Sequence, residues 1–108
     1  VLLETYTDPS VDVFVIPIGP TFNEAQNLTS ALRDEGLRVE IDLMGRGIGK
    51  NLNYANAKQI PIVLFLGEDE LKAKKTKLRD MVSGTEKMIA LNPATAVAKE
   101  INAILAKK

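Results

Sequence analysis

Cysteine and histidine are both absent from this chain, and each absence removes a class of function. Without cysteine the chain can form no disulfide, no thiolate metal site and no cysteine nucleophile, which fits a cytosolic protein. Without histidine it lacks the usual metal ligand and the general base that works most easily near neutral pH. A catalytic site would have to use carboxylates, Lys, Tyr or Ser/Thr. The composition therefore favours a binding module over an enzyme.

Long apolar runs are also missing. The longest, residues 60–66, contains Pro61 and falls well short of the ~20 residues needed to cross a bilayer. The chain begins VLLE, with neither Met nor a basic, signal-like segment. We therefore expect a cytoplasmic fragment of a longer protein, with no membrane partner. Residues 1–10 end in TDPS, which breaks regular structure, so they are predicted to be a linker from a preceding domain and residues 11–108 to be one domain.

The net charge is zero, but the charge is unevenly distributed. Residues 1–43 carry eight acidic and two basic side chains, a balance of −6, whereas residues 44–79 carry eight basic and three acidic ones, a balance of +5. A neutral chain with a basic middle suits a protein that meets an anion on one face, although ordinary solvated surface can look the same.

Two apolar, β-branched runs, residues 11–18 and 60–66, predict strands buried on both faces, as in a parallel sheet. Residues 37–43 alternate apolar and charged side chains and predict a strand with one polar face. Residues 76–81 and 87–91 predict two short strands joined by a hairpin turn at Ser83-Gly84.

Three helices are predicted between and after these strands. The first begins after Thr21, a residue type that caps helices, and ends at Gly36, which suits a left-handed stop. The second covers about residues 50–59, and the third covers residues 94–106, with Pro93 expected at its first helical position. The predicted fold is α/β: a three-layer α/β/α arrangement whose five-stranded mixed sheet has three parallel strands plus a C-terminal hairpin, with three helices.

A glycine-rich loop, GRGIGKN at residues 45–51, comes close to two phosphate-binding motifs but matches neither. A P-loop needs Gly at the position of Met44 and Ser or Thr at that of Asn51, and the dinucleotide fingerprint needs a different glycine spacing. Three glycines before a helix, with Arg46 and Lys50 beside them, still suit a phosphodiester backbone. A loop that uses its glycines only for turning is the alternative.

Charged residues gather again after the third predicted strand. The acidic turn EDE at residues 68–70 is expected at the C-terminal edge of the sheet, where open α/β sheets bind ligands. Its carboxylates come from one segment, so we predict no metal site. Residues 72–79 contain five basic side chains, of which Lys77 and Arg79 should point from the same strand face. A hairpin that is basic only for solubility remains the alternative.

Tyr54, on the second helix, has two interpretations. Its ring could stack on a splayed base, or it could pack between helix and sheet with its hydroxyl at the surface.

The chain resembles the anticodon-binding domain shared by the histidyl, threonyl, prolyl and glycyl class II aminoacyl-tRNA synthetases. The resemblance covers about residues 11–91, and the YA pair at residues 54–55 and GEDEL at residues 67–71 look most like the histidyl branch. Three stretches carry it: VFVIPIG at 13–19, LRVEIDL at 37–43 with the glycine loop and Lys50, and IPIVLFLGEDEL at 60–71 with the basic strand at 76–80.

The resemblance implies a domain that grips the anticodon of tRNA and leaves catalysis to an absent domain. By alignment with the threonyl branch, Glu70 matches a carboxylate that accepts hydrogen bonds from an anticodon base, and Arg79 matches an arginine that reaches the anticodon. The threonyl branch has a base-reading Asn where this chain has Gly45, so that contact is lost. From charge alone, Arg46, Lys50 and Lys77 are predicted to contact the tRNA backbone. No cofactor is expected here, whereas the parent is expected to be an ATP- and Mg-dependent ligase and a homodimer.

Two other classes of function are alternatives for this sequence. A synthetase-like paralogue could use the same fold for protein interaction or regulation, because a fold does not determine a function. A small α/β enzyme or receiver-like domain is disfavoured, because PIG at residues 17–19 stands where paired aspartates would be needed.

Overall fold

The computed structural model describes residues 11–43, 45 and 47–106. The predicted linker, residues 1–10, lies outside them. In chain order, the strands and helices of the described part are β2 (Val13–Pro17), α1 (Phe22–Asp34), β3 (Val39–Ile41), α2 (Ile48–Ala57), β4 (Ile62–Leu66), α3 (Glu68–Lys72), β5 (Lys75–Asp80), β6 (Glu86–Ala90) and α4 (Ala94–Leu105).

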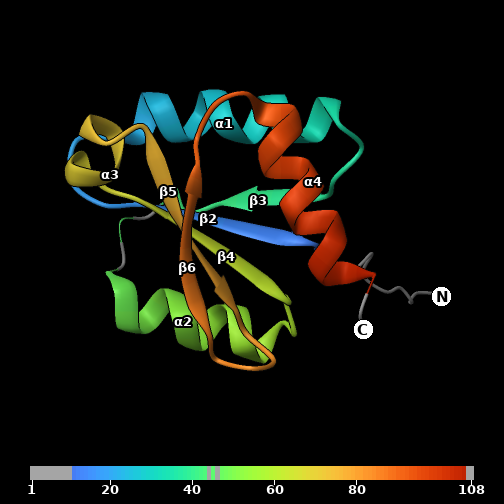
Figure 1. Ribbon diagram of the computed structural model, residues 1–108. Helices are drawn as coiled ribbons and strands as arrows, with labels where there is room; N and C mark the ends of the chain where they lie inside the picture. The colour runs from blue at the N-terminus through green and yellow to red at the C-terminus, as the bar shows by residue number, and fades with distance from the viewer. Residues whose placement is uncertain (1–10, 44, 46, 107–108) are drawn as a thin grey trace, which may run out of the picture.

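The sheet has the order β3-β2-β4-β5-β6 (Figure 1). β2 pairs in parallel with β3 and β4, whereas β4 with β5 and β5 with β6 are antiparallel. The predicted mixed sheet of three parallel strands and a C-terminal hairpin is therefore confirmed, with β4 at its centre. As the continuous apolar runs indicated, β2 and β4 are buried on both faces.

Helices cover the sheet unequally. α1 and α4 lie on one side and α2 lies on the other (Figure 1). Val13, Val15 and Leu64 point into the core on the α1/α4 side, and Phe14 and Phe65 point into the core beneath α2. Successive strand residues thus serve opposite cores, as the period of two requires.

The number of helices is where the sequence-based prediction is wrong. The structure has four helices in its described part, not three, because the acidic segment after β4 forms the short helix α3 rather than a turn. Acidic residues in its first turn, Glu68, Asp69 and Glu70, favour a helix here because carboxylates are stabilised near a helix N-terminus.

Three other details refine the predicted boundaries. Gly36 has φ +91°, the left-handed conformation expected where the first helix stops. Thr21 occupies the N-cap position of α1 but makes no side-chain cap, since its hydroxyl donates instead to the Leu66 carbonyl at 2.7 Å. Pro93 is the N-cap residue of α4, one position earlier in the helix than predicted.

The polar side chains predicted on one face of residues 37–43 meet different environments: Arg38 is exposed, whereas Glu40 is half-buried and Asp42 is buried. Glu40 pairs in register with Phe14 and so lies on the α2 side of the sheet, and Asp42 beyond the strand is buried. Their polar partners come from α2 and are described below. Within the described residues, no helix is both long and apolar enough to span a membrane.

Candidate nucleic-acid interface

The C-terminal edge of the parallel strands is where β2 and β4 both end. Pro17 and Leu66 are register partners at that edge, and the chain continues from them into Ile18-Gly19 and into α3. A hollow of about 370 Å³ there is lined by Ile18, Gly19 and residues 67–70. The edge predicted to bind a ligand therefore carries the carboxylates of α3.

Glu70 is half-buried in this edge and anchored to the backbone. Its Oε1 accepts a hydrogen bond of 2.7 Å from the Gly67 N–H, so that it closes the first turn of α3. Gly67 is needed for this arrangement, because a Cβ at that position would come within 2.5 Å of Glu70 Oε1. The carboxylate is thus held at one place on the edge.

β5 sends alternate side chains to opposite faces. Thr76 and Leu78 are buried on the α1/α4 side, where the Thr76 hydroxyl donates to the Phe65 carbonyl at 2.9 Å. Lys77 and Arg79 lie together on the α2 side, which confirms the prediction that they share a strand face. Lys77 also places its Nζ 5.9 Å from the centroid of the Phe65 ring, at the outer limit of a cation–π contact.

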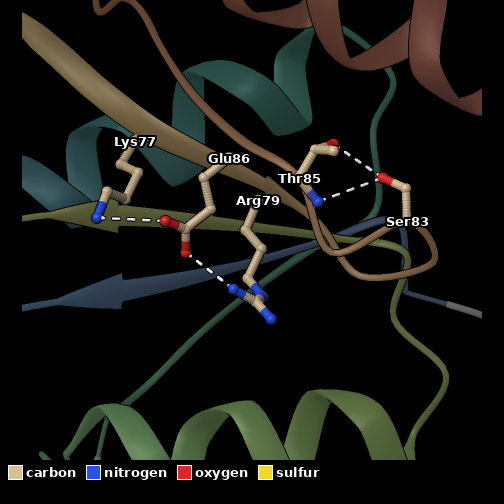
Figure 2. Close-up of polar contacts among 5 residues, drawn as sticks. All are labelled: Lys77, Arg79, Ser83, Thr85 and Glu86. Carbon is tan, nitrogen blue, oxygen red and sulfur yellow. Dashed lines mark hydrogen bonds and ion pairs between the residues drawn. The ribbon is translucent and has the colours of Figure 1, made fainter.

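Glu86 joins these two cations from the neighbouring strand. It stands opposite Arg79 in the β5–β6 register, accepts from Arg79 Nη1 at 2.9 Å and lies 3.5 Å from Lys77 Nζ (Figure 2). The hydrogen bond from Arg79 is the main cause that lowers the pKa of the Glu86 carboxyl below its ordinary value; desolvation opposes it, and the charge of Lys77 lowers the pKa further. We call Lys77, Arg79 and Glu86 the hairpin charge cluster.

Sequence reasoning missed Glu86. The fifth strand was predicted to begin one residue later, at Lys87, so no partner was assigned to Arg79. The sequence did contain a signal for it. Pairing residues outward on both sides of the turn at Ser83-Gly84 places Glu86 opposite Arg79, and an acid opposite a base is a favourable cross-strand pair.

A pocket of about 150 Å³ connects Glu70 with the hairpin charge cluster. Glu70, Lys77 and Glu86 border it, whereas Arg79 does not. Four apolar side chains form the rest of its lining: Ile18, Ile48, Leu52 and Phe65. An apolar surface bordered by acceptors and a cation can receive a flat aromatic ring and hydrogen-bond its edge.

A larger hollow, about 620 Å³, opens at the other end of β5, between the β5–β6 turn and α4. Val82, Thr85 and Ile104 are among the residues that line it; of the hairpin charge cluster only Glu86 does, and Glu70 does not. This hollow is larger than the small pocket, but it lacks Glu70 and both cations of the hairpin charge cluster, so it is not the candidate site.

Buried polar contacts hold α2, which supplies one wall of the small pocket. Asn51 is fully buried and donates from Nδ2 to Asp42 Oδ2 at 2.8 Å. The Tyr54 hydroxyl donates to Glu40 at 2.9 Å, and its ring lies 5.2 Å from that of Phe14. Tyr54 thus packs between helix and sheet, as the packing interpretation predicted.

The other predicted phosphate contacts are less tightly grouped. Lys50 is exposed in the first turn of α2 and does not line the small pocket, and Arg46 lies outside the described residues. Gly47 is the N-cap residue of α2 with φ +91°, a conformation that favours glycine, and Gly45 also has a positive φ. At least part of the glycine content of this loop therefore serves the turn into α2.

In the part of the chain that the structure describes, no group of three or more Asp, Glu, His or Cys side chains is placed to hold a metal ion.

Known proteins resemble this chain in both sequence and structure. The histidine–tRNA ligase of Methanococcus maripaludis is 40% identical over 82 residues, which are 73% of this chain and 20% of that protein. Histidine–tRNA ligase 1 of Bacillus cereus is 40% identical over 83 residues, 77% of this chain and 19% of that protein. The crystal structure of a histidyl-tRNA synthetase from Nostoc superimposes with a TM-score of 0.83 at 28% identity, covering 90% of this chain and 23% of the other.

The chain thus spans about a fifth of the length of the curated relatives it matches. A family described as "Anticodon binding domain" matches residues 12–101, from the start of β2 through most of α4. That range contains both Glu70 and the hairpin charge cluster. The chain belongs to the anticodon-binding domain family, in the form found in histidyl-tRNA synthetases.

Proposed function

We propose that this chain binds the anticodon arm of a tRNA at the C-terminal edge of its sheet, and that the tRNA is the histidine-accepting one. The observation that carries the proposal is the pocket of about 150 Å³, which places Glu70 and Lys77 around an apolar surface in a chain of this family. Single-stranded loops are commonly recognised in this way, with splayed bases against apolar surface and hydrogen bonds to their edges.

Glu70 is proposed to accept hydrogen bonds from an anticodon base. A carboxylate has more acceptor positions than the single Gly67 N–H uses, so it can also receive an amino or imino donor of a base. Because α3 and Gly67 hold it in place, little side-chain entropy is lost when a base binds.

Arg79 is proposed to reach the anticodon with donors that Glu86 does not use. Glu86 engages only Nη1, which leaves Nη2 for another acceptor, whereas Nε is buried without a hydrogen-bond partner among the described residues. A guanidinium can donate to base acceptors and stack on a base plane at the same time. Lys77, Lys50 and Arg46 are proposed to contact backbone phosphates, where their charge is sufficient.

The protein to which this domain belongs is proposed to be a histidine–tRNA ligase, since the relatives of this chain carry that name. ATP and Mg²⁺ would be bound by its catalytic domain, and the whole protein would be a cytoplasmic homodimer. This chain would position tRNA and perform no chemistry itself. None of the observations favours the alternative of a paralogue domain used for protein interaction or regulation.

Fluorescence anisotropy with labelled anticodon stem-loops tests the proposal. The chain is titrated with the histidine anticodon loop and with loops of other anticodons. Arg79→Ala should cost about 1–3 kcal/mol of binding free energy. Glu70→Gln should reduce discrimination between loops more than it reduces overall affinity, because it replaces one acceptor oxygen by a donor.

Lys87→Ala is the matched control. Lys87 is also a basic residue of the hairpin and is ion-paired at 2.9 Å, but its partner Glu100 lies on α4, on the opposite face. It should leave binding within about two-fold of the unmodified chain, since an exposed pair is worth little. Equal affinity for every stem-loop, or equal losses in Lys87→Ala and Arg79→Ala, would contradict the proposed site.

A further inference from the structure

Glu86 has a position that phosphate binding does not explain. It brings a negative charge between the two cations that the proposed site would use on RNA. From this geometry we infer that Glu86 is a specificity-determining residue. It neutralises part of the charge of Lys77 and Arg79 and orients the Arg79 guanidinium, so that unspecific phosphates are bound poorly. The inference rests on the proposed function and adds a residue to that site.

The hairpin turn sets the position of Glu86. Asp80 begins the turn, and its Oδ1 accepts from the backbone N–H groups of Val82 at 2.9 Å and Ser83 at 3.3 Å. Ser83 and Thr85 then share a hydroxyl hydrogen bond of 2.8 Å (Figure 2), and Asp80 N–H donates to the Thr85 carbonyl at 2.9 Å. These contacts define the register in which the next residue, Glu86, stands opposite Arg79.

The charges explain how one carboxylate can affect specificity. Together the three residues carry one net positive charge instead of two, in side chains that remain 30–43% exposed. A phosphate that approaches must compete with Glu86 for Arg79 and Lys77, and phosphates are the same on every RNA. A base that also contacts Glu70 and the apolar surface gains interactions that a phosphate alone cannot make.

A purely structural ion pair would behave differently, and the pair that links the hairpin to α4 offers a comparison. Lys87 and Glu100 are also 2.9 Å apart, but they lie on the α4 side of the hairpin, and their side chains are 52% and 42% exposed. If Glu86 only stabilised the hairpin, then Glu86→Gln and Glu100→Gln would affect RNA binding alike.

The test measures binding of the chain to poly(U), as an unspecific polyanion, and to matched and mismatched anticodon stem-loops over a range of salt concentrations. Glu86→Gln should bind poly(U) on the order of five-fold tighter, and its plot of log affinity against log salt should steepen by up to about 0.7, the value for one added phosphate contact on a single strand. Its preference for the matched loop should fall by a similar factor.

Glu86→Asp keeps the charge and should retain the shallow salt dependence, and Glu100→Gln should stay within about two-fold of the unmodified chain. Circular dichroism confirms that each variant is folded. The inference is overturned if Glu86→Gln and Glu100→Gln change poly(U) binding equally, or if Glu86→Gln fails to bind poly(U) more tightly. An unmodified chain that does not prefer any stem-loop would overturn the proposed function instead, while the poly(U) comparison still decides the role of Glu86.

Discussion

The two faces of the sheet differ in how completely helices cover them. On the α1/α4 side, apolar side chains from all five strands join one core, which reaches Leu78 on β5 and Ile89 on β6. On the α2 side, a smaller core is centred on Phe14 and Phe65, and the outer hairpin strands carry Lys77, Arg79 and Glu86 instead. The α1/α4 face thus holds the larger apolar core, and the α2 face, which is less covered, leaves charged side chains accessible to a ligand.

This difference shows how one strand can serve both purposes. β5 alternates Thr76 and Leu78 with Lys77 and Arg79, so that neighbours in sequence meet opposite environments. Leu78 is 1% exposed, whereas the side chain of Arg79 is 30% exposed. The two faces can therefore be perturbed separately by substituting adjacent residues.

The largest effect is expected from Leu78→Ala. Removal of a fully buried leucine should lower the free energy of unfolding by about 2–5 kcal/mol, from lost transfer energy and the cavity left behind. Urea denaturation measures it. Arg79→Ala is the paired control and should change stability by less than about 1 kcal/mol while it weakens RNA binding. Similar stability losses in the two variants would contradict the division between the faces.

Asn51→Ala should have the next largest effect. Asn51 is 0% exposed and donates to the buried carboxylate of Asp42, so its removal deprives that carboxylate of a hydrogen bond. We expect a loss of about 1–3 kcal/mol in the free energy of unfolding. Asn53→Ala, on the exposed side of the same helix, is the control and should change stability little. An equally small loss at Asn51 would mean that α2 is not held by this contact.

Gly67→Ala should affect binding more than stability. Its φ of −105° is open to alanine, but the added Cβ would meet the carboxylate of Glu70 and displace it. We expect RNA affinity to fall by roughly three- to ten-fold, through loss of an oriented acceptor, with less than about 1 kcal/mol of stability lost. Gly49→Ala is the control, because a Cβ there meets nothing within 4 Å. Unchanged RNA binding in Gly67→Ala would separate Glu70 from the site.

The smallest effect concerns pH. The pKa of Glu86 is lowered in the folded chain from its ordinary value of 4.5, so its ion pairs add stability above that value and lose it as the pH falls through the folded-state pKa. Unmodified chain and Glu86→Gln should therefore differ in stability by no more than about 1 kcal/mol near neutral pH and converge under acid conditions. Urea denaturation of both proteins, once near neutral pH and once in acid below the ordinary pKa of Glu86, measures the difference in stability. A difference that grows in acid would contradict the sign of the pKa shift.

Much of the fold could be predicted because the relevant signals are local. Continuous apolar runs identified β2 and β4, and Gly36 marked the end of α1. α3 was missed because a helix of five residues leaves too short a pattern to distinguish it from a turn. The burial of Asp42 could not be predicted, because alternation says which side of the sheet a residue faces, not whether a helix covers that side.

The candidate site was predicted in part. The shared face of Lys77 and Arg79 follows from alternation along one strand, and the location of Glu70 at the edge follows from the end of β4. The roles of these residues toward tRNA remain predictions. Glu86 was missed, because its importance depends on a cross-strand register that a shift of one residue in the predicted strand conceals.

By itself, the sequence determined which side chains are apolar at a period of two, where the chain turns, and that positive charge gathers in its middle. Tertiary structure decided which charged residues meet. Glu86 reaches Arg79 across a hairpin, and Glu70 shares a pocket with Lys77 and with Ile48 from α2. Composition and periodicity describe a residue and its near neighbours, whereas such contacts depend on strand register and on the crossover that brings α2 to this face.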